Sequence, residues 1–251
     1  MLVFAALVPQ TALLVPGVSG RTEVLTAERT ATLRAVQALL ASRPDRVVVV
    51  VPGPDLRVTG LLRPSLAAAG LDDDRLGWAP AVLGVPEGSD VPTTVDDVAA
   101  AVGLHLLARA GWTGRTGVLG VPVGPGLVER GRAAVAGVDR VALLLCASLS
   151  ARRGPGSPLA EDERAPAFDE AVLADLLALG ASPAAARKAR RGLAAVPAEL
   201  AVALAVSAWA PWQVLLGALG PTPVRSEEVL VSVPLGATYA VLTWKPSEDV
   251  R

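Results

Sequence analysis

Apolar and polar positions along the chain fall into blocks that predict strands and helices in turn. Solidly apolar runs predict buried strands at Leu2–Val8, Arg46–Val51, Thr116–Val121 and Arg140–Ala147, and a weaker run predicts a strand at Leu76–Leu83. The intervening segments predict helices over Thr26–Ala41, Gly60–Ala69, Thr94–Ala110, Leu127–Ala136 and Phe168–Leu179. Strands that alternate with helices are typical of an α/β fold.

The last part of the chain predicts a hairpin that makes the sheet mixed. Two short β-rich runs, Val229–Val233 and Tyr239–Trp244, lie on either side of Pro234-Leu235-Gly236 and are close enough to pair. Thr94 and Asp97 form a capping-box pattern, and Ser182 followed by Pro183 is a helix start. We therefore expect one domain over residues 1–251, a three-layer α/β/α sandwich with a mixed central β-sheet, with Ser150–Ala165 as a long polar loop inside it.

Two apolar segments raise the question of a signal peptide or a membrane span. The first seventeen residues contain no basic n-region, and Pro9 and Pro16 break any helix there, so a strand and a turn are expected. The twenty residues Leu200–Leu219 carry no charge and meet the length of a span. Pro211 interrupts them and no basic cluster flanks them, which favours two buried helices meeting at Pro211, the first residue of the second helix. We expect a cytoplasmic protein, with membrane association as an alternative.

Composition excludes several classes of function. The 24 acidic and 23 basic residues nearly cancel, which argues against a nucleic-acid binder. A single cysteine, Cys146, excludes a disulfide within the chain and a cysteine-based zinc cluster. A single histidine, His105, excludes every site that needs two imidazoles from one chain.

No common catalytic motif is present. The sequence has no G-x-G-x-x-G, P-loop or G-x-S-x-G pattern. His105 lies among leucines in the middle of a predicted helix, and Cys146 ends an apolar strand, so both are interpreted as packing residues. The acidic run 161–163 is interpreted as a solvated loop face. Arg152 and Arg153 follow a central strand at the edge where α/β sheets bind ligands, and an anion-binding role for them is an alternative.

Four stretches in chain order carry a resemblance to a known superfamily: Ala5–Pro16, Ala147–Ala151, Ala210–Leu219 and Gly236–Trp244. They resemble the first strand and loop, the signature segment, the late tryptophan-containing helix and the terminal strand of the class III extradiol ring-cleavage dioxygenases, the LigB-like proteins. The resemblance spans nearly the whole chain. It implies the same α/β/α sandwich and, as partners, a second copy in a homodimer or a second subunit.

The chain departs from this superfamily at the residues that carry its chemistry. Members hold Fe(II) with two histidines and a glutamate, and use another histidine as acid and base. Gln10 stands in place of the first-loop histidine, while Ser148 and Ala151 replace the aspartate and histidine of the signature. No histidine lies near Val51–Gly60, and no acidic residue lies in Leu200–Ser226. A ferrous facial triad needs two imidazoles and a carboxylate, so no Fe(II) or other cofactor is expected.

These observations predict a LigB-like protein without the Fe(II) site and without ring cleavage, which acts as a binding or structural partner. The alternative is an enzyme that uses the same pocket with altered, metal-free chemistry or a metal supplied differently. The vestigial pocket is expected at the carboxyl edge of the sheet, with no catalytic residue, and to include Gln10, Ser148, Ser150, Ala151 and Arg152. Polar groups converging there would favour the enzyme.

Overall fold

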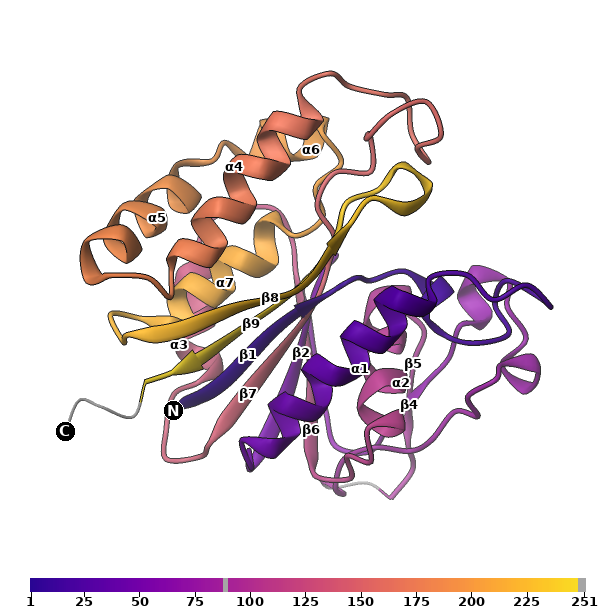
Figure 1. Ribbon diagram of the computed structural model, residues 1–251. Coiled ribbons are helices and arrows are strands. Elements are labelled where there is room, and N and C mark those ends of the chain that lie inside the picture. Colours follow the sequence, from indigo (N-terminus) through magenta and orange to yellow (C-terminus); the bar gives the residue numbers. More distant parts are fainter. Residues whose placement is uncertain (88–89, 248–251) are drawn as a thin grey trace.

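A mixed β-sheet with helices packed against it forms the body of the protein (Figure 1). The computed structural model describes residues 1–87 and 90–247, and among these seven strands form the main sheet in the order β3-β6-β2-β7-β1-β9-β8. Their bounds are β1 (Leu2–Val8), β2 (Arg46–Pro52), β3 (Leu56–Thr59), β6 (Arg115–Val121), β7 (Val141–Cys146), β8 (Val224–Ser232) and β9 (Tyr239–Pro246). The four central strands β6, β2, β7 and β1 run parallel, and β3, β9 and β8 each run antiparallel to a neighbour. The mixed sheet and the terminal hairpin are therefore confirmed.

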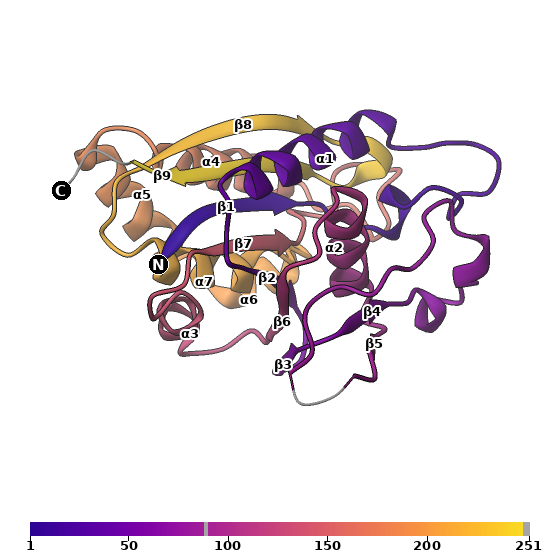
Figure 2. The same ribbon diagram turned by 90° about the horizontal axis from the view of Figure 1, so that it is seen from below.

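Helices lie on both faces of this sheet (Figures 1 and 2). One face is covered by α1 (Thr26–Ala41) and α2 (Val98–Arg109). The other is covered by α3 (Leu127–Ala134), α4 (Ala165–Ala178), α5 (Pro183–Ala195), α6 (Ala198–Ala203) and α7 (Trp209–Leu219). Because side chains alternate along a strand, the valine run of β2 serves both cores: Val48 and Val50 point to the α7 side and Val47 and Val49 to the α2 side.

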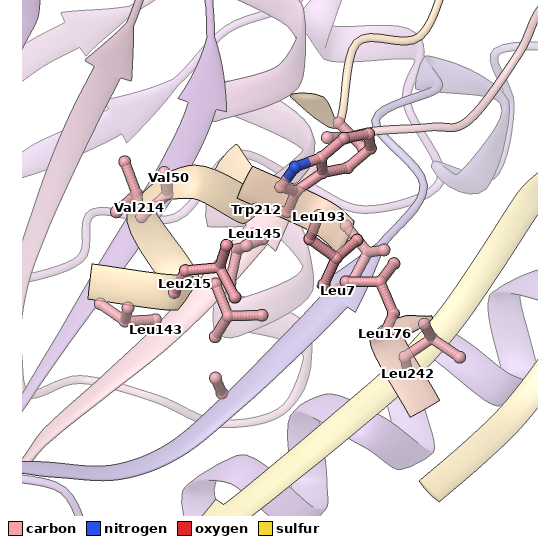
Figure 3. Packing of buried hydrophobic residues seen from close by; sticks show 14 of the residues in the cluster. Leu7, Val50, Leu143, Leu145, Leu176, Leu193, Trp212, Val214, Leu215 and Leu242 are labelled. Carbon is pink, nitrogen blue, oxygen red and sulfur yellow. The ribbon is translucent and has the colours of Figure 1, made fainter. Parts of the chain in front are cut away.

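The core on the α7 side is built from aliphatic side chains around a few tryptophans. Figure 3 shows Val214 and Leu215 of α7 among Leu143 and Leu145 of β7 and Val50 of β2. Leu143, Leu145 and Leu215 are at most 1% exposed. Burying each such side chain contributes about 2 kcal/mol, so this interface is a main source of stability.

Helices α3 and α7 cross at very short range, which two glycines make possible. A Cβ atom added at Gly131 would collide with the carbonyl oxygen of Val214, and one added at Gly217 would collide with that of Val128. Because overpacking forces backbones apart, both positions require glycine for this crossing. The crossing holds α7 against the centre of the sheet.

Residues 60–97 differ from the sequence prediction. Gly60–Ala69 is not a helix: it contains β4 (Leu62–Pro64) and a short 3-10 turn, and β4 pairs in parallel with β5 (Thr93–Val95) in a second small sheet. Leu76–Leu83 is not a strand, since within it only Leu83 forms an isolated bridge to Leu62. This segment covers the core with a few buried leucines and has no regular spacing for the prediction to use.

The observed caps correct one predicted helix start and confirm another. The helix predicted from Thr94 begins at Val98, because Asp97 is the residue whose side chain caps it, accepting the Ala100 N–H at 2.9 Å. By contrast, Ser182 caps α5 with Pro183 as its first residue, as predicted.

The uncharged segment Leu200–Leu219 forms α6, a short connection and α7, most of it buried. The break precedes Pro211, which is the third residue of α7 rather than its first. The chain turns at Ala205, whose φ of 54° lies in the left-handed region. Among the described residues, no helix reaches the length and apolarity that crossing a bilayer demands.

Candidate functional site

A pocket of about 450 Å³, here called the edge pocket, lies at the carboxyl ends of the parallel strands. The chain leaves β1 toward α1 on one face of the sheet and leaves the neighbouring β7 toward α4 on the other face. The loops therefore diverge and open a crevice between the two strand ends, which is where open α/β sheets bind their ligands. The wall includes residues that follow β1 and β7, the end of β2, the start of α2 and the connection from α6 to α7.

Three of the sequence-predicted residues line the edge pocket together. They are Gln10 after β1, and Ser148 and Ala151 after β7. Gln10 Oε1 and Ser148 Oγ are both buried and have no hydrogen-bond partner among the described residues. Ser148 as a whole is 8% exposed. Buried polar atoms are nearly always paired, so two unpaired ones on a single wall make this pocket the candidate site.

Ser150 and Arg152 are not among the residues that line the edge pocket. The Ser150 hydroxyl donates to the Leu204 carbonyl at 2.7 Å and accepts the Arg152 N–H at 3.1 Å. The Arg152 guanidinium donates to the Ala160 carbonyl at 2.8 Å. Both side chains thus hold the long loop after β7 in place, outside the pocket wall.

A buried carboxylate anchors the same loop. Asp169 of α4 is 1% exposed and accepts the Ser150 N–H at 3.2 Å. Its Oδ2 lies 4.0 Å from Nε of Arg153. Burial raises the pKa of Asp169 above its ordinary value, and hydrogen bonding and the Arg153 charge oppose that shift. Arg153 is therefore paired inside the protein rather than presented to a free anion.

Four polar residues of the edge pocket, Thr11, Asp97, Ser207 and Tyr239, were not predicted as site residues. Ser207 holds Ser148 in position: its hydroxyl accepts the Ser148 N–H at 2.8 Å and donates to the Ser148 carbonyl at 3.1 Å. Asp97 is the one charged residue among the described residues that line the pocket. Tyr239 also lines it, and burial raises the pKa of its hydroxyl. Asp97 carried a visible capping pattern, whereas Ser207 lay inside an apolar run that gave no signal.

The donors of the edge pocket do not fit the ferrous site that the resemblance implies. The described wall offers one amide, several hydroxyls and a single carboxylate, with no imidazole or thiol. In the described part of the chain, no three His, Cys, Asp or Glu side chains gather closely enough to hold a metal ion. A ferrous facial triad needs two imidazoles and a carboxylate, and the described wall supplies no imidazole.

His105 and Cys146 are packing residues, as the sequence predicted. His105 is 1% exposed within α2, and burial lowers its pKa, an effect that the Asp73 charge opposes. Both of its ring nitrogens lack a hydrogen-bond partner among the described residues. Cys146 is fully buried at the end of β7, and burial raises the pKa of its thiol, so it stays protonated.

Comparison with known proteins yields no assignment. No family model and no curated protein matches the chain. Among solved structures, the crystal structure of the uncharacterized protein JW3007 from Escherichia coli K12 is similar, with a TM-score of 0.44 and 16% sequence identity. The match covers 97% of this chain and 99% of that one. A likeness at this level assigns neither a family nor a function.

Proposed function

We propose that the protein is a LigB-like relative of the extradiol dioxygenases that binds a small hydroxyl-bearing molecule in the edge pocket, without Fe(II) and without ring cleavage. In this proposal the mixed sheet and its helices are the three-layer α/β/α sandwich of that superfamily. The observation that carries the proposal is the pair of buried oxygens, Gln10 Oε1 and Ser148 Oγ, that have no partner on the described pocket wall.

The free-energy cost of leaving these two buried oxygens unpaired favours a ligand that donates hydrogen bonds. A buried polar atom left unpaired costs about 1–3 kcal/mol. Hydroxyl groups on a bound molecule would donate to both atoms and recover that free energy. The only charge on the described wall is the Asp97 carboxylate, which disfavours an anionic ligand. A pocket of about 450 Å³ has the size that small-molecule sites have.

The same wall supports binding over catalysis. Gln10 offers an amide oxygen where the superfamily has an imidazole, and Ala151 offers no group that moves a proton. Asp97 is the one carboxylate on the described wall, and its Oδ1 already caps α2. The enzyme alternative called for Ser150 and Arg152 to converge with the other polar groups of the pocket, and neither lines the described wall, so binding is the better-supported function.

The proposed absence of an Fe(II) site is tested by exposing the protein to ferrous iron. The protein is purified anaerobically with ferrous iron, its metal content is measured, and catechol cleavage is followed by the absorbance of the ring-opened product. We expect substoichiometric iron and no cleavage, for the wild type and for Gln10→His alike, because the second imidazole and the carboxylate are still missing. Stoichiometric iron with ring opening would overturn this part.

The binding part is tested with catechol and its dimethyl ether, veratrole, in calorimetric titrations. Catechol carries two hydroxyl donors, whereas veratrole has the same ring and none. We expect catechol to bind the wild type more tightly than veratrole does, and Ser148→Ala to lose that preference. The matched control is Ser182→Ala, a helix cap outside the pocket wall. Equal binding of the two compounds would contradict a donor-recognising pocket.

A further inference from the structure

A second pocket, of about 260 Å³, lies at the β3 end of the sheet on the face that carries α3. Figure 2 shows β3 and β6 forming the side of the sheet that is remote from α4 and α5. We call it the arginine pocket because three arginines line it: Arg46 at the start of β2, Arg57 of β3 and Arg130 of α3. It shares no lining residue with the edge pocket.

The floor of the arginine pocket is apolar and is opened by a glycine. The register places Arg57 opposite Leu119 and Thr59 opposite Gly117 in β6. Gly117 has no side chain to fill the space, and a Cβ atom there would lie 3.3 Å from Thr59 Cγ2. Val48 and Ala133 are also part of the apolar lining. The floor therefore fits a compact apolar group.

The charges on the rim do not cancel. Arg130 donates to both carboxylate oxygens of Asp55 at 2.6 Å, and this interaction lowers the pKa of Asp55, so the pair is a closed, neutral unit. Arg46 donates to the Ala134 carbonyl at 3.0 Å, but its buried Nε has no partner. Among the described residues, neither Arg46 nor Arg57 forms an ion pair.

We propose that the arginine pocket binds a small anion, a carboxylate or phosphate group carried on a compact apolar body. A guanidinium presents its N–H groups in a fork that matches the oxygens of both groups. The low-dielectric walls strengthen the field of the two uncompensated charges inside the pocket. The oxyanion lies between Arg46 and Arg57, satisfies the free Nε of Arg46, and leaves the apolar body on Gly117 and Leu119.

Four probes separate the head group from the body in calorimetric titrations: benzoate, phenyl phosphate, benzyl alcohol and inorganic phosphate. We expect benzoate or phenyl phosphate to bind, and benzyl alcohol and inorganic phosphate each to bind about tenfold more weakly or worse, because a charge-assisted hydrogen bond contributes at least that factor. Binding of benzoate indicates a carboxylate ligand, and binding of phenyl phosphate indicates a phosphate ligand. Binding should weaken as salt is added.

Three variants place the anion in this pocket. Arg57→Ala removes an exposed charge without disturbing the core, and Gly117→Val fills the floor with a strand-favouring side chain. Arg46→Met keeps the aliphatic stem but removes the charge. Each should weaken binding about tenfold or more. Arg109→Ala, an exposed arginine at the end of α2, is the matched control and should leave binding unchanged.

The proposal fails if neither anion binds the wild type, or if benzyl alcohol binds as tightly as benzoate. It also fails if Arg57→Ala and Gly117→Val bind the anion like the wild type. Loss of anion binding in Ser148→Ala instead would move the anion to the edge pocket and overturn this proposal. The two pockets share no residue, so failure here leaves the proposed function untouched.

Discussion

Gln10 and Ser148 stand at equivalent places beyond two neighbouring parallel strands. The register pairs Val8 of β1 with Cys146 of β7, and each site residue lies two positions after its strand's paired residue. Parallel strands end at the same edge, so the two side chains reach the same crevice although 138 positions separate them in the chain. Each leaves a buried oxygen without a described partner there.

Two serines on this wall should respond in opposite directions to loss of the hydroxyl. Ser148→Ala removes an unpaired buried oxygen and should raise the free energy of unfolding by about 1 kcal/mol. Ser207→Ala removes the group that bonds both the N–H and the carbonyl of Ser148, and should lower it by about 2 kcal/mol. Urea unfolding of the wild type and both variants measures the contrast.

Ser148→Ala should lose ligand binding while it gains stability. Stability and binding oppose each other where a site keeps an unsatisfied group for its ligand. If Ser148→Ala were destabilised as strongly as Ser207→Ala, the Ser148 hydroxyl would have to be bonded in the free protein, and the ligand argument would lose its basis.

Gly217→Ala should destabilise the protein although it replaces glycine inside a helix. In an open helix this change would stabilise by about 1 kcal/mol. Here the added Cβ collides with the Val128 carbonyl of α3, and the resulting overpacking should cost about 3 kcal/mol. Thermal unfolding by circular dichroism decides between the two signs.

The control for this substitution is Gly156→Ala, in the loop after β7. A Cβ atom there meets nothing within 4 Å, and its backbone needs no positive φ. Its free energy of unfolding should stay within about 0.5 kcal/mol of the wild type. A stabilised Gly217→Ala would mean that α3 and α7 do not cross as closely as described.

The parts of the fold that followed from sequence are those with strong local patterns. The valine run of β2 reads as a strand buried on both faces, and the structure buries it on both faces. The prediction for residues 60–97 was wrong because the few buried leucines there follow no regular spacing. The parallel pairing of β4 with β5 involves tertiary packing, since α2 packs against β4. Ser207 could not be predicted, since only the tertiary turn at Ala205 brings it to Ser148.

Cys146 should report global unfolding through its reactivity. Its side chain is fully buried, and burial and the Asp97 charge both raise its thiol pKa, so the reactive thiolate does not form in the folded state. We expect Ellman's reagent to label the native protein slower than the unfolded protein by a factor on the order of 1000 or more, since exposure requires most of the folding free energy. Rapid labelling without denaturant would contradict the burial of β7.

The sharpest stability prediction concerns His105, the single histidine of the chain. Both of its ring nitrogens are buried without described partners in α2. His105→Leu fills the same apolar space without those polar atoms, and should raise the free energy of unfolding at pH 7.5 by about 1–2 kcal/mol. Urea unfolding at pH 7.5 gives this first difference.

The pH dependence then identifies the imidazole as the cause. Burial lowers the folded-state pKa of His105 below its ordinary value of 6.5, and the Asp73 charge only partly offsets this. Below pH 6.5 the unfolded chain binds a proton at His105 more readily than the folded protein does. The free energy of unfolding of the wild type is therefore free of this proton effect above pH 6.5, and it falls as the pH drops from 6.5 toward the folded pKa. The advantage of His105→Leu over the wild type should widen between pH 7.5 and pH 5. Other groups, such as Asp169, titrate in both proteins and cancel in this difference, so an advantage that stayed constant with pH would show that His105 is solvated or paired in the folded state.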